Sequence, residues 1–405
     1  MKHVLAKWLR KTYNQITGSI AFYPALIAIG FLLLSWIMLE LDFSESGKHI
    51  KSNYYLIRLR DASTARTIVS TIVTGIISLA VFSFSMVMIL LNQAASQLSN
   101  RTLENMIANR FQQLVLGSYI GTIVYALFLL STIRDLDTGI YVPALSIYLL
   151  VLFTVGDIFL FIYFLHFITQ TVKFETIIKR VQNRTLKTLQ LSGTSSVWLP
   201  FNRPDTVKTI ISMPAANYYQ SFDDRDMMRF AEQHDGIIVF LHPKGTYLLK
   251  GMPLLEFYAG YQLSDRQIDE LLDALDFYVG QPVEKNAYFG FHQLTEIALK
   301  ALSPGINDPQ TAVLSLNALT ALFAYLLNHT QPSALHDKRG QVRLYLRNYS
   351  FEELFAVCYP PVWHYGAKDP YLQQAVKVML IQLLSTAPPG TNTKCIINFL
   401  DQNVE

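Results

Sequence analysis

The sequence predicts a membrane α-helical protein with four transmembrane helices, followed by a cytoplasmic α+β module and then a helical region. Three observations predict this class. The chain of 405 residues is 51% hydrophobic and only 16% charged, whereas soluble proteins average about 25% charged residues. Its mean hydropathy is +0.26. The excess of apolar residues falls within positions 1–172, and charged residues return beyond them.

Four segments are apolar enough to cross a bilayer, which takes about 20 residues of helix. They are 20–39, 67–91, 113–133 and 141–168. The first is too long for the apolar part of a signal peptide and has no small-residue cleavage site, so we expect it to remain as an anchor. Eleven Lys and Arg residues lie near the span ends on the side of both termini, and six lie on the other side. The positive-inside rule therefore predicts that both termini are cytoplasmic.

The second span is unusual because no charged residue occurs from Thr67 to Asn100. As one helix, this segment would be about 50 Å long, more than the thickness of the hydrocarbon. Its polar residues recur at helical spacing and share one stripe. The members of this polar stripe are Thr67, Thr71, Thr74, Ser78, Ser85, Asn92 and Ser96. Two interpretations stand: the small side chains pack helices together, or copies of the stripe surround water and line an ion path.

Two ionisable residues lie within the fourth span. Asp157 is its only acidic residue. A carboxyl group at membrane depth either marks an ion or proton path or bonds to a Ser or Thr of a neighbouring helix. His166 lies nearer the cytoplasmic end, about two and a half turns away, so the two side chains face opposite sides of the helix. We expect His166 to be interfacial and not to form a relay with Asp157.

The tail has its own pattern of elements. A helical extension and linker at 173–204, with the linker itself at 191–204, precede an α+β module at 205–262 and a helical region at 263–405. Strands are predicted at 207–213, 216–222, 236–242 and 247–257, with a helix at 224–233 capped by Asp223 or Asp224. Further helices are predicted from a capping box at Ser264 and Gln267 through Tyr278, and at 289–302, 309–327, 351–357, 370–385 and 393–401.

The segment between two of these helices, ALSPGINDPQTA at 301–312, is dense in turn signals. Pro304 and Gly305 end one helix, and Asp308 before Pro309 caps the next. The segment is either a tight corner or an anion or ligand site built on amides at a helix start. The residues of that second interpretation are Ser303, Gly305, Asn307, Asp308 and Thr311.

Four segments carry motifs that recur together in one family. They are DASTAR at 61–66, SLAVFSFSMVMILLNQAASQ at 78–97, the segment 289–294 and the segment 301–312. With these motifs the chain resembles the bacterial predicted membrane proteins grouped as domain of unknown function 2254. It differs from the family pattern at His166, at 282–286 and at His292. The resemblance implies four spans in the bacterial inner membrane and carries no activity.

The sequence lacks the motifs of several classes of protein. There is no phosphate-binding loop, no paired-cysteine metal motif and no His-Glu-x-x-His, so we expect no enzyme and no metal or other cofactor. A net charge of +3 gives no basic surface for nucleic acid. The partners that we expect are the lipid bilayer, further copies of the chain and a small ion.

The pattern favours a homo-oligomer in which the polar stripe lines an ion channel and the tail gates it. One alternative is a non-conducting receptor or scaffold whose region 205–330 binds a ligand or protein. Another is an ion-coupled transporter that uses Asp157, although the chain shows no evident inverted repeat.

Overall fold

The computed structural model describes residues 21–53, 59, 61–97, 110–136, 139–171, 173–192, 206–280, 283, 285–329 and 331–403. The chain forms two compact units. The first contains residues 1–96 and 102–173, and the second contains 97–101 and 174–405. Most of the predicted linker at 191–204 lies outside the described residues, and its first two positions end a helix.

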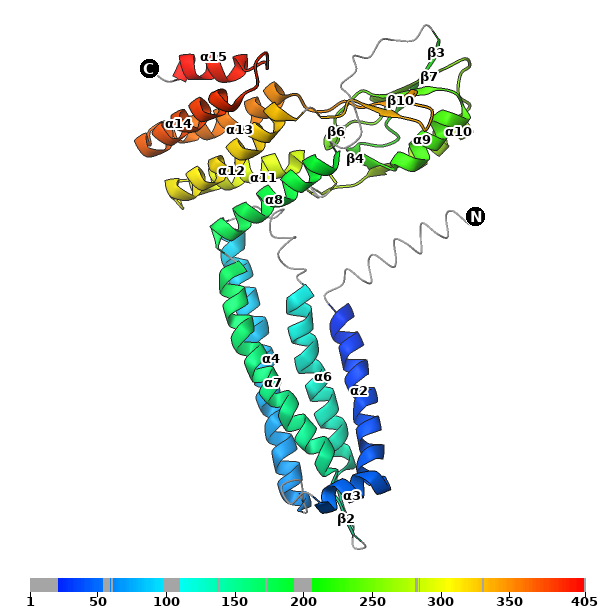
Figure 1. The fold of residues 1–405 in the computed structure, drawn as a ribbon, viewed down its shortest axis with the longest axis vertical. Coiled ribbons are helices and arrows are strands. Elements are labelled where there is room, and N and C mark those ends of the chain that lie inside the picture. Colours follow the sequence, from blue (N-terminus) through cyan, green and yellow to red (C-terminus); the bar gives the residue numbers. More distant parts are fainter. Residues whose placement is uncertain are drawn as a thin grey trace. The chain divides into compact units, whose positions relative to one another are not determined.

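The first unit is built from four long helices, drawn as rods from blue to green in Figure 1. They are α2 (Phe22–Phe43), α4 (Ala62–Gln97), α6 (Arg110–Thr132) and α7 (Ala144–Thr171). Each covers one of the predicted spans, with shifted ends. Between them lie α3 (Glu45–Asn53) and the hairpin of β1 (Arg134–Leu136) and β2 (Gly139–Tyr141), which the sequence pattern does not predict.

Five helices in the described residues are long and apolar enough to cross a membrane. Four of them belong to the first unit, and the fifth, α12 (Pro309–Asn328), belongs to the second. In α12, 56% of the most apolar window is buried within the chain, against 11% to 44% in the other four. Burial on most sides is the pattern of a core helix, and it accounts for the apolar sequence of α12.

Helix α4 begins at Ala62, ahead of the predicted start at 67, because Asp61 caps it. The Asp61 carboxylate accepts hydrogen bonds from the amides of Ser63 at 3.2 Å and Thr64 at 2.8 Å. The Thr64 hydroxyl, with these amides, holds the pKa of Asp61 below its ordinary value. An ionised carboxylate therefore stands at the start of α4 near neutral pH.

Two glycines of α6 allow α2 to approach closely. A Cβ atom at Gly117 would lie 2.5 Å from Ile27 Cδ1, and one at Gly121 would lie 2.8 Å from the Phe31 ring. Small residues four positions apart are a common way to bring membrane helices into contact. The contact between α2 and α6 thus depends on two glycines of α6.

A buried carboxylate joins the end of α2 to the start of α7. Asp42 is fully buried, and it accepts hydrogen bonds from the amides of Leu145 at 3.1 Å and Ser146 at 2.8 Å. A negative charge at a helix N-terminus is stabilised by the free amides and the helix dipole. The first predicted span stops at residue 39, so the apolar pattern does not predict this contact.

The second unit contains two sheets. The larger has the order β3-β7-β5-β10-β9 and the smaller β6-β4-β8. The strands are β3 (Val207–Ser212), β4 (Asn217–Phe222), β5 (Ile237–Phe240), β6 (Thr246–Leu248), β7 (Pro253–Ala259), β8 (Leu275–Phe277), β9 (Ala334–His336) and β10 (Val342–Tyr345). Neighbouring strands are antiparallel except for β5 and β10, which are parallel. Leu254, Leu255, Phe257 and Leu344 lie in their shared core.

Two predictions about the strands need correction. The α+β module is not confined to 205–262, because β8, β9 and β10 come from the region predicted as helical. The predicted strand at 247–257 is two strands, separated by a turn in which Gly251 has φ +83°, a conformation that favours glycine. The predicted helix from Ser264 ends at Asp273, and β8 follows it.

Helices make up the rest of the second unit. Asp223 caps α9 (Asp224–Gln233), and the Ser264–Gln267 pair begins α10 (Asp265–Asp273). The others are α8 (Phe174–Ser192), α11 (Tyr288–Ala301), α12, α13 (Phe351–Tyr365), α14 (Pro370–Thr386) and α15 (Lys394–Asn403). Figure 1 shows α12 to α15, in yellow to red, grouped beside the sheets. Most bounds agree with the predicted helices, but α13 continues past 357 through two prolines.

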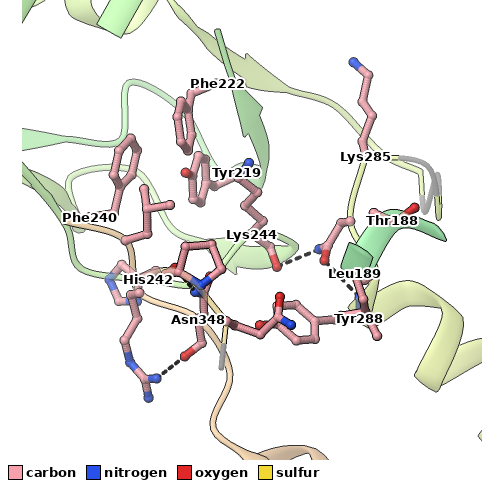
Figure 2. Close-up of a pocket in the computed structure, with 16 residues that line it drawn as sticks. Thr188, Leu189, Tyr219, Phe222, Phe240, His242, Lys244, Lys285, Tyr288 and Asn348 are labelled. Atoms are coloured by element: carbon pink, nitrogen blue, oxygen red, sulfur yellow. Dashed lines mark hydrogen bonds between the residues drawn. The ribbon is translucent and has the colours of Figure 1, made fainter. Parts of the chain in front are cut away.

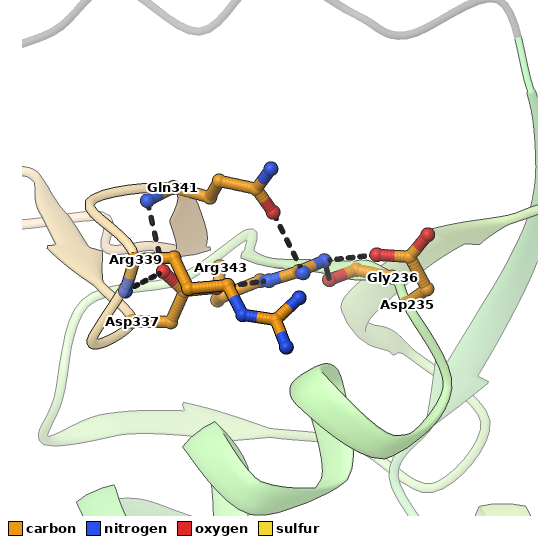
Figure 3. A network of polar contacts seen from close by, with 6 residues as sticks. All are labelled: Asp235, Gly236, Asp337, Arg339, Gln341 and Arg343. Carbon is orange, nitrogen blue, oxygen red and sulfur yellow. Dashed lines mark hydrogen bonds and ion pairs between the residues drawn. The ribbon is translucent and has the colours of Figure 1, made fainter.

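Arg343 on β10 ties the late strands to the early ones (Figure 3). Its guanidinium donates to Asp337 Oδ2 at 3.0 Å, to Asp235 Oδ1 at 2.8 Å and to Gln341 Oε1 at 2.8 Å. The side chains of Arg343 and Asp337 are only 9% and 3% exposed. The Gln341 amide and the Arg343 guanidinium hold the pKa of Asp337 below its ordinary value, although burial opposes them. The buried ion pair with Asp337 is local, and the bond to the exposed Asp235 joins Arg343 to a segment 108 positions away.

Candidate functional site

The polar stripe lies on the exposed face of α4. Its described side chains are all exposed in the single chain: Thr67, Thr71, Thr74, Ser78, Ser85 and Asn92. The side chain of Ser96 lies outside the described residues. The opposite face of α4 packs into the first unit through Ala65, Val69, Val73 and Ile76. The described part of the stripe is therefore not buried by packing within one chain.

The hydroxyl groups of the stripe donate to carbonyl groups of their own helix. Thr71 Oγ1 lies 2.7 Å from the Thr67 carbonyl oxygen, and Ser78 Oγ lies 2.9 Å from that of Thr74. Thr74 Oγ1 makes the same bond to Ser70 at 2.9 Å. A hydroxyl group that has donated its one proton still carries acceptor lone pairs. This face of α4 consequently presents oxygen lone pairs, the ligand type that hard cations prefer.

The exposed faces of the other long helices have a different composition. Leu33 on α2 is 52% exposed and Phe159 on α7 is 68% exposed, and both are surrounded by further exposed apolar side chains. Between positions 63 and 78 of α4, Ile77 is the one large hydrophobic side chain that is exposed. A Cβ atom at Gly75 would have no neighbour within 4 Å. Apart from Arg66 and Ile77, the first half of α4 thus exposes small, mostly polar residues where α2 and α7 expose hydrocarbon.

The second half of the exposed face is mixed. Val81 and Ile89 are each 61% exposed, and they flank the exposed Ser85. Asn92 lies about one turn after Ile89 and about two turns after Ser85, so it is on the same side of α4. The face therefore changes along the helix from hydroxyl groups to alternating apolar and polar side chains.

Asp157 lies inside the bundle of the first unit. Its side chain belongs to a residue that is 2% exposed, and its Oδ1 accepts a hydrogen bond from Ser118 Oγ at 2.6 Å. This is the bond to a neighbouring helix that one of the two predicted interpretations requires. Its other oxygen, Oδ2, is buried without a hydrogen-bond partner in the described part of the chain. The hydroxyl group of Thr122, on the same neighbouring helix, also interacts with this carboxyl group.

Further buried hydroxyl groups near Asp157 also lack a geometric partner among the described residues. They are those of Ser83 on α4 and of Tyr119 and Thr122 on α6. The hydroxyl groups nevertheless interact within the cluster: Thr122, one turn after Ser118 on α6, interacts with Asp157, and Ser83 interacts with Tyr119. Asp157 is thus an ionisable group among buried hydroxyl groups inside an apolar bundle, a setting in which membrane proteins place protons and ions.

His166 is separate from this cluster. It is exposed on α7, whereas Asp157 faces the interior. The structure does not bring the two residues together, in line with their spacing.

The segment 303–311 forms a tight corner between α11 and α12. The amides of Ile306 and Asn307 donate to the Ser303 carbonyl oxygen at 2.9 Å, and that of Asp308 donates to Ala301 at 2.8 Å. Asp308 caps α12 through the Thr311 amide at 3.1 Å and the Thr311 hydroxyl at 2.6 Å. Gly305 has open space around it, and Asn307 has φ +48°. These amides are already used within the chain, which favours the corner over the predicted anion site.

Comparison with known proteins gives a family and no activity. A family model described as "Predicted membrane protein (DUF2254)" matches residues 17–383. The uncharacterized proteins MT1328 and Rv1290c of two Mycobacterium tuberculosis strains, and Mb1321c of Mycobacterium bovis, are each 27% identical to the chain over 315 residues.

The match covers 75% of this chain and 59% of each relative, so the chain spans less than two thirds of their length. No solved structure matches the chain. The family model extends over both compact units and carries the description of a membrane protein. The chain therefore belongs to the DUF2254 family of predicted membrane proteins.

Proposed function

We propose that the protein is a homo-oligomer of the bacterial inner membrane that conducts cations along a path lined by α4, with both termini in the cytoplasm. One observation carries the proposal: the exposed face of α4 bears hydroxyl groups where α2 and α7 expose hydrocarbon. Hydroxyl groups gain little from contact with lipid tails. They can hydrogen-bond to water, and their small size allows close contact with an identical face. When copies of α4 surround a symmetry axis, this face meets both water and the identical face of a neighbouring copy.

The proposed path has three parts. The ionised Asp61 of each copy attracts cations to one mouth, as acidic rings do in cation channels. Hydroxyl oxygens from Thr67 to Ser78 then replace part of the hydration shell. Val81 and Ile89 narrow the second half with apolar side chains, and a hydrophobic constriction of this kind gates by losing its water. The second unit is the gating element in this scheme.

Cysteine substitution along α4 tests whether this face meets water. In membranes, a hydrophilic thiol reagent should modify cysteines placed at Thr67, Thr71, Thr74 and Ser78. Cysteines placed at Leu152 and Phe159 on α7, which are exposed but proposed to face lipid, serve as controls and should stay protected. Uniform protection of the α4 positions would contradict the proposal and favour the receptor or scaffold, in which the stripe only packs helices.

The two native cysteines give a low background in that experiment. Burial raises the pKa of Cys358 to about 12 and that of Cys395 to about 11. The thiolate is the reactive form, so both residues should react slowly at pH 8.

Ion-coupled transport is the second candidate, and the buried position of Asp157 among hydroxyl groups favours it. In Asp157→Asn, the amide keeps an oxygen for the Ser118 bond but loses the charge that a bound cation or proton needs. We expect this variant to abolish the flux of the transported substrate that an ion gradient drives in proteoliposomes. The variant protein should still assemble. Thr154→Ser on the same helix is the matched control. Flux equal to that of the unmodified protein would remove Asp157 from the mechanism.

A further inference from the structure

The second unit contains a cavity of about 90 Å³ that the ion path does not use. Figure 2 shows its wall, to which β4, the turn after β5, the end of α8 and the segment before α11 contribute. Three residues with cationic side chains line it, Lys244, Lys285 and Arg347. No described Asp or Glu lines it. The described wall therefore carries cationic side chains and no carboxylate.

Lys244 lies in this wall without a counter-ion. Its Nζ lies 4.2 Å from the centroid of the Phe222 ring, and no carboxylate of the described residues forms an ion pair with it. Burial lowers the pKa of Lys244, although Asp224 and Asp276 act in the opposite direction from further away. A contact with an aromatic face offsets only part of the cost of removing an ammonium group from water.

The other two cations of the wall are already paired. Lys285 Nζ lies 3.3 Å from Asp276, and Arg347 lies 2.5 Å from Glu353. The backbone of Lys244 is also fixed, because its carbonyl oxygen accepts a hydrogen bond from Asn286 Nδ2 at 2.9 Å. The free ammonium is therefore held in place rather than extended into solvent.

Two neutral donors of the same wall also lack partners among the described residues. Gln331 Nε2 is buried without a hydrogen bond. Tyr219 is 1% exposed, and no hydrogen bond to its hydroxyl group occurs within the described ranges. Buried donors are normally paired. One ammonium, one amide and one phenol thus line a cavity that has no acidic residue in its described wall.

We propose that this cavity binds a phosphate group, carried by a small soluble molecule or by a lipid headgroup, with Lys244 as its counter-ion. Lysine binds phosphate as a point charge, and the additional donors suit an anion with several oxygens. The inference is independent of ion conduction, because the cavity lies wholly within the second unit.

Binding of phosphate probes to the purified full-length protein tests the inference. Inorganic phosphate and glycerol phosphate are titrated calorimetrically against the protein in detergent. Thermal melting is compared in nanodiscs of phosphatidylglycerol and of phosphatidylcholine. Binding of either soluble probe identifies a soluble ligand. A melting temperature raised by phosphatidylglycerol alone identifies a lipid headgroup.

Lys244→Met keeps the apolar stem beside Phe222 and removes the charge. We expect it to weaken phosphate binding by about tenfold or more, since charged hydrogen bonds contribute that much, or to remove the effect of phosphatidylglycerol. It should melt no lower than the unmodified protein, because it removes an unpaired charge. Lys250→Met, at an exposed neighbouring lysine, should bind as the unmodified protein does. Equal affinity in Lys244→Met, or no effect of any probe, would overturn the proposal.

Discussion

Replacement of Ser78 by Trp should abolish the cation current of the reconstituted protein. Ser78 lies on the exposed face of α4, at the end of its hydroxyl-bearing half. In the proposed homo-oligomer every copy contributes this position to one path, so several indole rings would meet at the same level. They would fill the opening and remove the oxygens that replace water around the ion. Recordings in planar bilayers, under voltage and under membrane tension, measure the effect.

The control for Ser78→Trp is Ile158→Trp on α7. Ile158 is 46% exposed and belongs to a face that we assign to lipid, where a tryptophan is tolerated. This variant should conduct as the unmodified protein does. A Ser78→Trp protein with an unchanged unitary current would show that α4 does not line the path.

Removal of the Arg343 guanidinium should destabilise the second unit by about 3 kcal/mol, because breaking a buried ion pair leaves a charge without its partner. In Arg343→Ala the Asp337 carboxylate, whose side chain is 3% exposed, loses the contact at 3.0 Å. The bond to Asp235 is lost as well, although that side chain is 89% exposed and contributes less. The fraction that survives a brief protease pulse across a urea series measures the change.

Arg339→Ala is the matched control, because in the network only the backbone amide of Arg339 bonds to Asp337. It should leave the urea midpoint unchanged. The pKa of Asp337 is lower in the folded state than its ordinary value of 3.8. Its contribution is therefore present above pH 3.8 and is lost as the pH falls through the folded value. The difference between Arg343→Ala and the unmodified protein should narrow under these acidic conditions. A midpoint of Arg343→Ala equal to that of the control at pH 7 would contradict this role.

Local patterns predicted most of the helices. The four apolar runs became α2, α4, α6 and α7, and the pattern at 224–233 became α9 with the predicted bounds. Such elements depend on periodicity and caps within one segment, which a single sequence contains. The polar stripe belongs to the same class, since its common face follows from helical spacing alone.

Long-range pairing could not be predicted in this way. Strands β8, β9 and β10 have only three or four residues each, which is too few for a periodic signal. Their positions in the sheet depend on contacts with distant segments. Arg343 on β10, for example, bonds to Asp235, which lies 108 positions earlier in the sequence. Such a pair cannot be predicted from the local sequence around either residue.

The candidate sites show the same limit. Asp157 was identifiable as the one acidic residue of its span, but Ser83, Tyr119 and Thr122 are single polar residues within apolar runs of two other helices. Lys244 carries no motif, and the cavity beside it forms only when the segments around 188, 219 and 331 meet. No local pattern in the sequence predicts that these residues lie close together in the fold.

Cation current through the purified, unmodified protein is the most direct test of the proposed path. In planar bilayers with a salt gradient, we predict discrete unitary currents whose reversal potential shifts toward that of the cation. Bilayers that stay silent under both voltage and tension, with the protein incorporated and folded, would contradict the assignment of α4 as the lining of an ion path.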